Sequence, residues 1–166
     1  FVVNGNSEMQ KIAPGIGSGV GGFYSASDNR IYAVVDRRSG NGDNTLFHEY
    51  THHFMLHYLP GPYPAWFIEG FAEYYATVDM NRSRSRVGLF NPGRMNSLTG
   101  QFQWVPMEDL LASRTSQLRG NQIHIFYAQA WALTSYLYST PERTRQFGAY
   151  LQALGRGVEP VAALEG

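Results

Sequence analysis

Two histidines and one glutamate in the first third of the chain have the types and spacing of a catalytic metal site. His48 and His52 are four residues apart, and Glu49 directly follows the first histidine. On a helix, residues four apart lie on one face, so both imidazoles could bind one metal ion. Glu49 is rotated about 100° from His48 around the helix. We therefore expect its carboxylate beside the ion, where a base acting on water would lie.

This His-Glu-x-x-His pattern is the signature of zinc hydrolases. Catalytic zinc usually takes three protein ligands and keeps a fourth position for water, so a third ligand is needed. The metzincin arrangement would require a glycine at position 55 and a histidine at position 58, where this chain has Met55 and Tyr58. His53 points about 100° away from His52, and His57 is one position off on a continuing helix. We therefore interpret His53 and His57 as non-ligands.

A second stretch, residues 66–74, reads Trp-Phe-Ile-Glu-Gly-Phe-Ala-Glu-Tyr. It resembles the second zinc helix of the gluzincin metallopeptidases in the peptidase MA-like superfamily. Their aminopeptidase N-like branch carries a similar Trp-x-x-Glu-Gly-Phe-Ala run. The resemblance implies that Glu69 is the third zinc ligand. It extends over about residues 23–137, and the two zinc helices carry most of it.

Two further residues are candidates for the site. Glu73 lies four residues after Glu69 on the same helix face, so it could accept the ring N–H of a zinc-bound histidine. A solvated or salt-bridged carboxylate is the equal alternative. In the aminopeptidase N-like enzymes, a tyrosine on a later helix helps zinc to stabilise the oxyanion. The run that begins at Tyr127 is similar, which implies this catalytic role; a core tyrosine is the alternative.

The segment before the first zinc helix departs from that family branch. Its exopeptidases carry an upstream Gly-x-Met-Glu-Asn run, whose glutamate holds the free amine of the substrate. Residues 19–23 of this chain read Gly-Val-Gly-Gly-Phe and contain no acid. Aminopeptidase specificity is therefore not expected, and endopeptidase action is favoured.

The surrounding elements follow from periodicity and from turn residues. Helices are expected at about 45–59 and 64–78, separated by prolines, and further helices at about 107–111, 121–140 and 142–154. Residues 23–24 and 30–36 are expected to be strands, and strand 30–36 could pair with an extended substrate or serve only the core. The glycine-rich lead-in, residues 1–22, is expected to be mainly loop. The arginine-rich residues 81–100 are expected to form a solvated hairpin or loop.

Composition limits the partners and the compartment. Thirteen basic and thirteen acidic residues balance, so we expect no nucleic-acid partner. No apolar run reaches the roughly 18 residues of a membrane span. Cysteine is absent, which excludes zinc–thiolate sites and fits either redox compartment. The chain begins at Phe1, so we expect a fragment of a longer protein that could have lost an export signal. An exported location, periplasmic or extracellular, is favoured, and the oligomeric state stays open.

Together these observations predict one α+β, zincin-like catalytic domain over residues 1–166. A small, mostly antiparallel sheet would pack on the zinc-binding helices, and a helical half would follow. The predicted function is a zinc metallopeptidase with one Zn²⁺ held by His48, His52 and Glu69. Glu49 would act as general base on zinc-activated water, and the substrate would be a peptide or protein. The alternatives are a zinc-bound, non-catalytic peptide-binding module, a zinc hydrolase of a non-peptide bond, and a metal-free structural domain.

Overall fold

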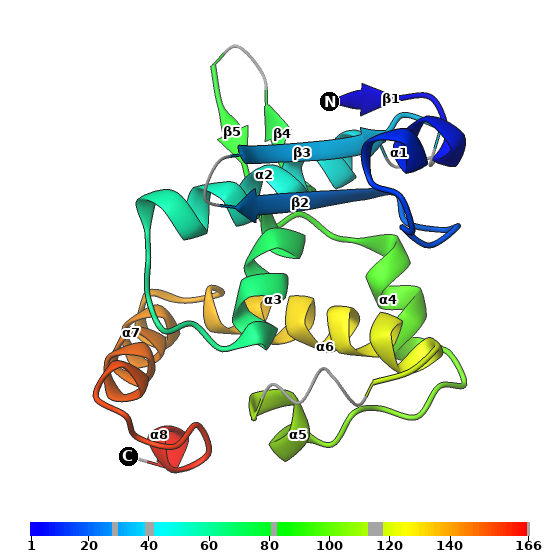
Figure 1. Cartoon of the computed structure of the whole chain (residues 1–166). Helices are drawn as coiled ribbons and strands as arrows, with labels where there is room; N and C mark the ends of the chain where they lie inside the picture. The colour runs from blue at the N-terminus through cyan, green and yellow to red at the C-terminus, as the bar shows by residue number, and fades with distance from the viewer. Residues whose placement is uncertain (28–29, 39–41, 81–82, 113–117, 166) are drawn as a thin grey trace.

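A small sheet lies at one end of the molecule and a set of helices at the other (Figure 1). The computed structural model describes residues 1–27, 30–38, 42–80, 83–112 and 118–165. In order, the elements are β1 (Val2–Val3), α1 (Asn6–Ile12), β2 (Gly22–Ser27), β3 (Arg30–Asp36), α2 (Gly42–Tyr58), α3 (Ala65–Ala76), β4 (Asp79–Met80), β5 (Ser85–Arg86), α4 (Pro92–Thr99), α5 (Met107–Leu111), α6 (Asn121–Leu137), α7 (Pro141–Gly155) and α8 (Ala162–Glu165). The mixed α+β class is therefore as predicted.

The sheet has three strands in the order β1-β3-β2. β2 pairs with β3 in antiparallel register along its whole length, and β1 pairs with the end of β3 in parallel register. Strand β3 is thus central, and β2 forms an edge. Helix α1 packs on this sheet through Met9, which is fully buried with Val3 and Val34. The prediction that residues 1–22 are mainly loop is wrong for Asn6–Ile12, a helix that is only two turns long and held by this burial.

A separate apolar core holds the helical part together. Helices α3 and α6 cross at close range (Figure 1), and Trp66 and Phe67 of α3 pack against Phe147 of α7. Gly70 lies at the crossing. A Cβ atom at this position would overlap the carbonyl oxygen of Ala130 and Oγ1 of Thr134. Only a glycine allows the two helices to approach this closely at this point.

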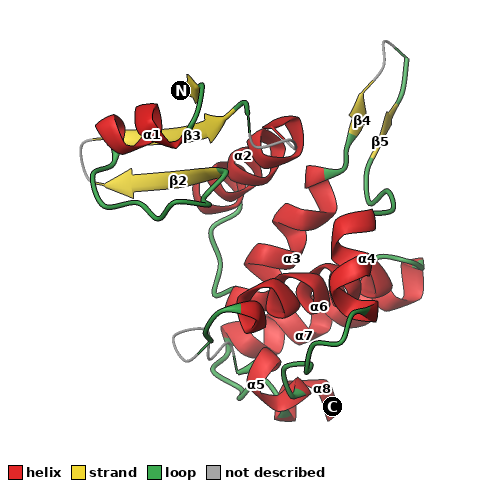
Figure 2. Ribbon diagram, turned by 90° about the vertical axis from the view of Figure 1, so that its right-hand side faces the viewer, coloured by secondary structure: helices red, strands yellow, loops and turns green. Residues whose placement is uncertain are grey.

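The described residues between 79 and 100 form a hairpin, which was one of the two predicted alternatives for residues 81–100, and a helix. Strands β4 and β5 make a short hairpin that projects from the helices (Figure 2). Helix α4 follows, and the sequence analysis did not predict it. The sequence nevertheless contains a local signal for the start of this helix. The Asn91 side chain caps the helix by accepting a hydrogen bond from the Arg94 N–H at 3.1 Å, and Pro92 lies in the first turn.

None of the helices within the described ranges has both the length and the apolar character needed to cross a membrane.

Candidate metal centre

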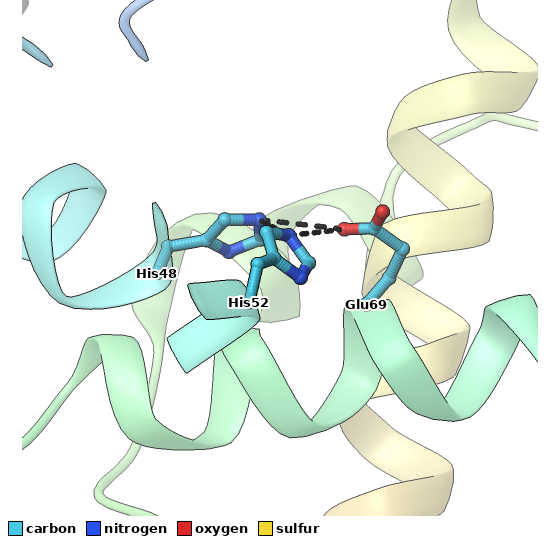
Figure 3. Close-up of side chains that lie close together, drawn as sticks. All are labelled: His48, His52 and Glu69. Carbon is cyan, nitrogen blue, oxygen red and sulfur yellow. Dashed lines mark hydrogen bonds and ion pairs between the residues drawn. The ribbon is translucent and has the colours of Figure 1, made fainter. Parts of the chain in front are cut away.

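Helices α2 and α3 bring three potential ligand atoms together (Figure 3). His48 Nε2 and His52 Nε2 lie 3.0 Å apart. Oε2 of Glu69 lies 3.3 Å from the first of these nitrogens and 3.4 Å from the second. The three side chains form a group that could hold a metal ion, as the sequence predicted.

The dimensions of this group fit a zinc ion. Two ligands that each lie about 2.0–2.1 Å from a tetrahedral ion are about 3.3 Å apart, which is close to all three separations. In addition, Oε2 of Glu69 is buried, makes no hydrogen bond of good geometry among the described residues, and faces only the two imidazole nitrogens. A buried carboxylate oxygen in this position is costly unless a cation meets it, either a protonated imidazole or a metal ion. The donor set of two imidazoles and one carboxylate is also a common one for catalytic zinc.

Glu73 lies behind His48, on the side away from the other two ligand atoms. Its Oε1 atom is 3.2 Å from His48 Nδ1, so an N–H at Nδ1 leaves Nε2 free for a metal. Arg94 of the unpredicted helix α4 and Asn91, which caps that helix, also reach this carboxylate. Arg94 donates from Nε to Oε2 at 2.8 Å and from Nη2 to Oε1, and Asn91 Nδ2 donates to Oε2 at 3.4 Å.

Glu49 is buried beside the cluster, with 8% of its surface exposed. It lines two adjoining cavities together with His48 and Tyr127. Burial raises the pKa of Glu49, and the charges of His48 and His52 only partly oppose this. The carboxylate is therefore next to the candidate metal site and has increased affinity for a proton. Its role as general base stays a prediction.

Tyr127 approaches the cluster from α6. Its ring centroid is 6.1 Å from that of His48, and the guanidinium of Arg94 lies 5.1 Å from the centre of its ring. Burial, and then the charge of Glu69, raises the pKa of Tyr127, so the phenol keeps its proton. The structure thus brings Tyr127 to the site, and its catalytic role stays a prediction.

His53 lies outside the cluster, where its Nδ1 is 3.2 Å from the hydroxyl of Tyr24.

The strand beside the site is β2, not the predicted strand 30–36. Gly22, Phe23 and Tyr24 line the cavity that also contains His48, His52 and Glu69. β3 is the central strand, and β2 covers its edge on the side of the site (Figure 1). The edge strand beside the site is therefore Gly22–Ser27 and not residues 30–36. Sequence patterns do not decide this point, because the edge position depends on how the sheet docks on α2.

The charges within the cluster predict how metal binding depends on pH. Burial by itself lowers the pKa of His48, but the facing carboxylates of Glu69 and Glu73 outweigh burial and raise this pKa to about 9. Burial acts on Glu69 in the opposite direction, but His48 and His52 outweigh it and lower its pKa to about 2. Near neutral pH the metal-free cluster thus holds a proton on His48 that an incoming ion must displace.

We therefore expect displacement of the His48 proton to contribute about one released proton per zinc ion at pH 7.5, and we expect this contribution to fall as the pH rises through about 9. Isothermal titration calorimetry in buffers of different ionisation enthalpy measures the proton count. The raised pKa of His48 also stabilises the metal-free fold. This contribution is fully present below the ordinary histidine pKa of 6.5 and is lost as the pH rises through about 9. Zinc binding without proton release at pH 7.5 would show that His48 is already neutral.

The fold and the cluster define a class: a mixed α+β domain with a His/His/Glu group that could hold a metal ion. The chain belongs to the family described as "Protein of unknown function (DUF1570)", whose model matches residues 44–161. This range includes the three candidate ligands, Glu49, Glu73, Arg94 and Tyr127. Neither the curated proteins nor the solved structures include a significant match to this chain.

Proposed function

We propose that this protein is a zinc-dependent metallopeptidase of the gluzincin type. One observation carries the proposal: three ligand atoms from two helices converge at separations typical of tetrahedral zinc, with a buried glutamate beside them. The second zinc helix with its Glu69-Gly70 pair, and a small sheet whose edge adjoins the site, support a zincin-like arrangement.

A bound zinc ion would supply Lewis acidity, which lowers the pKa of a water toward about 7 and polarises the scissile carbonyl. Glu49 accepts the proton of the attacking water and then delivers it to the leaving amine. The raised pKa of its carboxyl favours this uptake. The phenol of Tyr127 donates a hydrogen bond to the carbonyl oxygen as negative charge develops there.

The free edge of β2 is suited to hold an extended peptide. The Gly21 carbonyl accepts from the Asp36 N–H at 2.8 Å, so it points toward β3. Because backbone groups alternate along an antiparallel strand, Gly22, Tyr24 and Ala26 point theirs to the free edge. Main-chain pairing of this kind binds a substrate without requiring one sequence. With no acid in residues 19–23 to hold a free amine, we propose endopeptidase action.

The first test is the zinc content and the peptidase activity of the purified protein beside Glu69→Ala. We expect one zinc per wild-type chain by elemental analysis and cleavage of a quenched fluorescent peptide mixture. The Glu69→Ala variant should lose both, because two imidazoles alone leave the ion with too few protein ligands.

The possible outcomes of this experiment distinguish the alternative functions. Zinc with peptide binding but no cleavage would indicate a non-catalytic binding module. Zinc with cleavage of ester or other non-peptide substrates only would redirect the proposal to another bond. A wild-type protein that takes up no zinc after reconstitution would overturn it.

A further inference from the structure

Arg94 of α4 contacts two parts of the site that come from different helices. Its guanidinium donates two hydrogen bonds to the carboxylate of Glu73 on α3. The same group lies over the ring of Tyr127 on α6. Glu73 in turn lies against His48 on α2. One side chain thus links a candidate zinc ligand to the candidate oxyanion donor.

These contacts occupy nearly all of the hydrogen-bond acceptor positions of the Glu73 carboxylate. Oε1 faces His48 Nδ1 and Arg94 Nη2, and Oε2 accepts from Arg94 Nε and Asn91 Nδ2. A carboxylate has about four lone-pair positions, so four donors leave it little freedom to rotate. Two parallel N–H groups from an arginine also define the plane of the carboxylate, which one ammonium group cannot do.

We infer that Arg94 is a positioning residue of the metal centre, which fixes both the Glu73 carboxylate behind His48 and the ring of Tyr127. This inference rests on the proposed function, but it concerns the metal affinity of the chain as well as its activity. It also assigns a purpose to α4, which contributes no ligand. Asn91 caps that helix and contacts Glu73, so the start of α4 and the carboxylate are held together.

The test is a double-mutant cycle on zinc affinity, measured by chelator competition with the full chain. Arg94→Met keeps an unbranched apolar stem over Tyr127 but removes every donor. Alone, it should weaken zinc binding about 10- to 100-fold, the usual range for partners that orient a ligand. Arg94→Lys retains the charge without the two-point geometry and should recover only part of this loss.

Glu73→Gln and the double variant, which combines Arg94→Met with Glu73→Gln, complete the cycle. If Arg94 acts on the metal through Glu73, the double variant should bind zinc no more weakly than Glu73→Gln alone. A merely structural role in holding α4 would give additive losses, or a lower melting temperature with unchanged zinc affinity. Either result, or wild-type affinity in Arg94→Met, would overturn the inference.

Arg86→Met is the matched control. Arg86 pairs with Asp79 on the projecting β4–β5 hairpin and is largely exposed, so its loss should leave zinc affinity unchanged. Circular dichroism of each metal-free variant verifies the fold. If Arg94→Met does not fold, Arg94→Lys still decides, because wild-type affinity in that variant would contradict the need for a bidentate contact.

Cobalt substitution gives a readout that does not depend on catalysis. The visible spectrum of Co²⁺ reports ligand geometry, so Arg94→Met should change it and Arg86→Met should not. If the wild type binds zinc but cleaves no peptide, the proposed function fails while these affinity and spectral results still test Arg94.

Discussion

Replacement of Glu49 by glutamine is expected to lower kcat for peptide hydrolysis by about 10²- to 10⁴-fold while zinc remains bound. Glutamine has nearly the same size as glutamate but cannot accept a proton from water. Glu49 contributes none of the three atoms that converge as ligands, so the zinc content should stay at the wild-type value. Kinetics with a quenched peptide and elemental analysis of the same preparation measure both quantities.

Glu142→Gln is a suitable control for this substitution. Glu142 is an exposed residue at the start of α7 and pairs with Arg145, so the same chemical change there should leave kcat unaltered. Full activity in Glu49→Gln would remove Glu49 from the mechanism. Loss of zinc from that variant would instead mean that Glu49 supports the metal.

Gly70→Ala is expected to lower the free energy of unfolding by about 1–3 kcal/mol or more. The added methyl group would overlap backbone atoms of Ala130, including a carbonyl carbon only 2.8 Å away. Backbone cannot rotate aside as a flexible side chain can, so α3 and α6 must separate. Because Glu69 precedes Gly70, this separation should also weaken zinc binding. Urea denaturation of the metal-free protein and chelator competition measure the two effects.

Gly148→Ala provides the matched comparison. Gly148 lies inside α7, and a Cβ atom there would meet nothing within 4 Å. The substitution should therefore raise stability by about 0.5–1 kcal/mol, because alanine is the better helix former. Equal behaviour of the two variants would contradict a close α3–α6 contact at Gly70.

The sequence by itself determined the local features of this protein. The i, i+4 spacing of His48 and His52, the prolines after α2, and the Glu69-Gly70 run all act within one or two helical turns. They sufficed to predict α2, α3 and the pairing of the two histidines, whereas Glu69 was predicted as the third ligand from the family resemblance. The α+β class also followed from local patterns, because strands and helices differ in their hydrophobic period.

Only the tertiary structure decided which distant groups meet. Glu73 had two equal interpretations in the sequence, and its contacts with His48 and Arg94 depend on how α4 packs. The edge role belongs to β2 rather than residues 30–36, because docking of the sheet on α2 selects which strand adjoins the site. Such contacts join residues far apart in the chain, and sequence spacing carries no information about them. The close approach of α3 and α6 at Gly70 and the contact between Arg94 and Glu73 are further contacts of this kind.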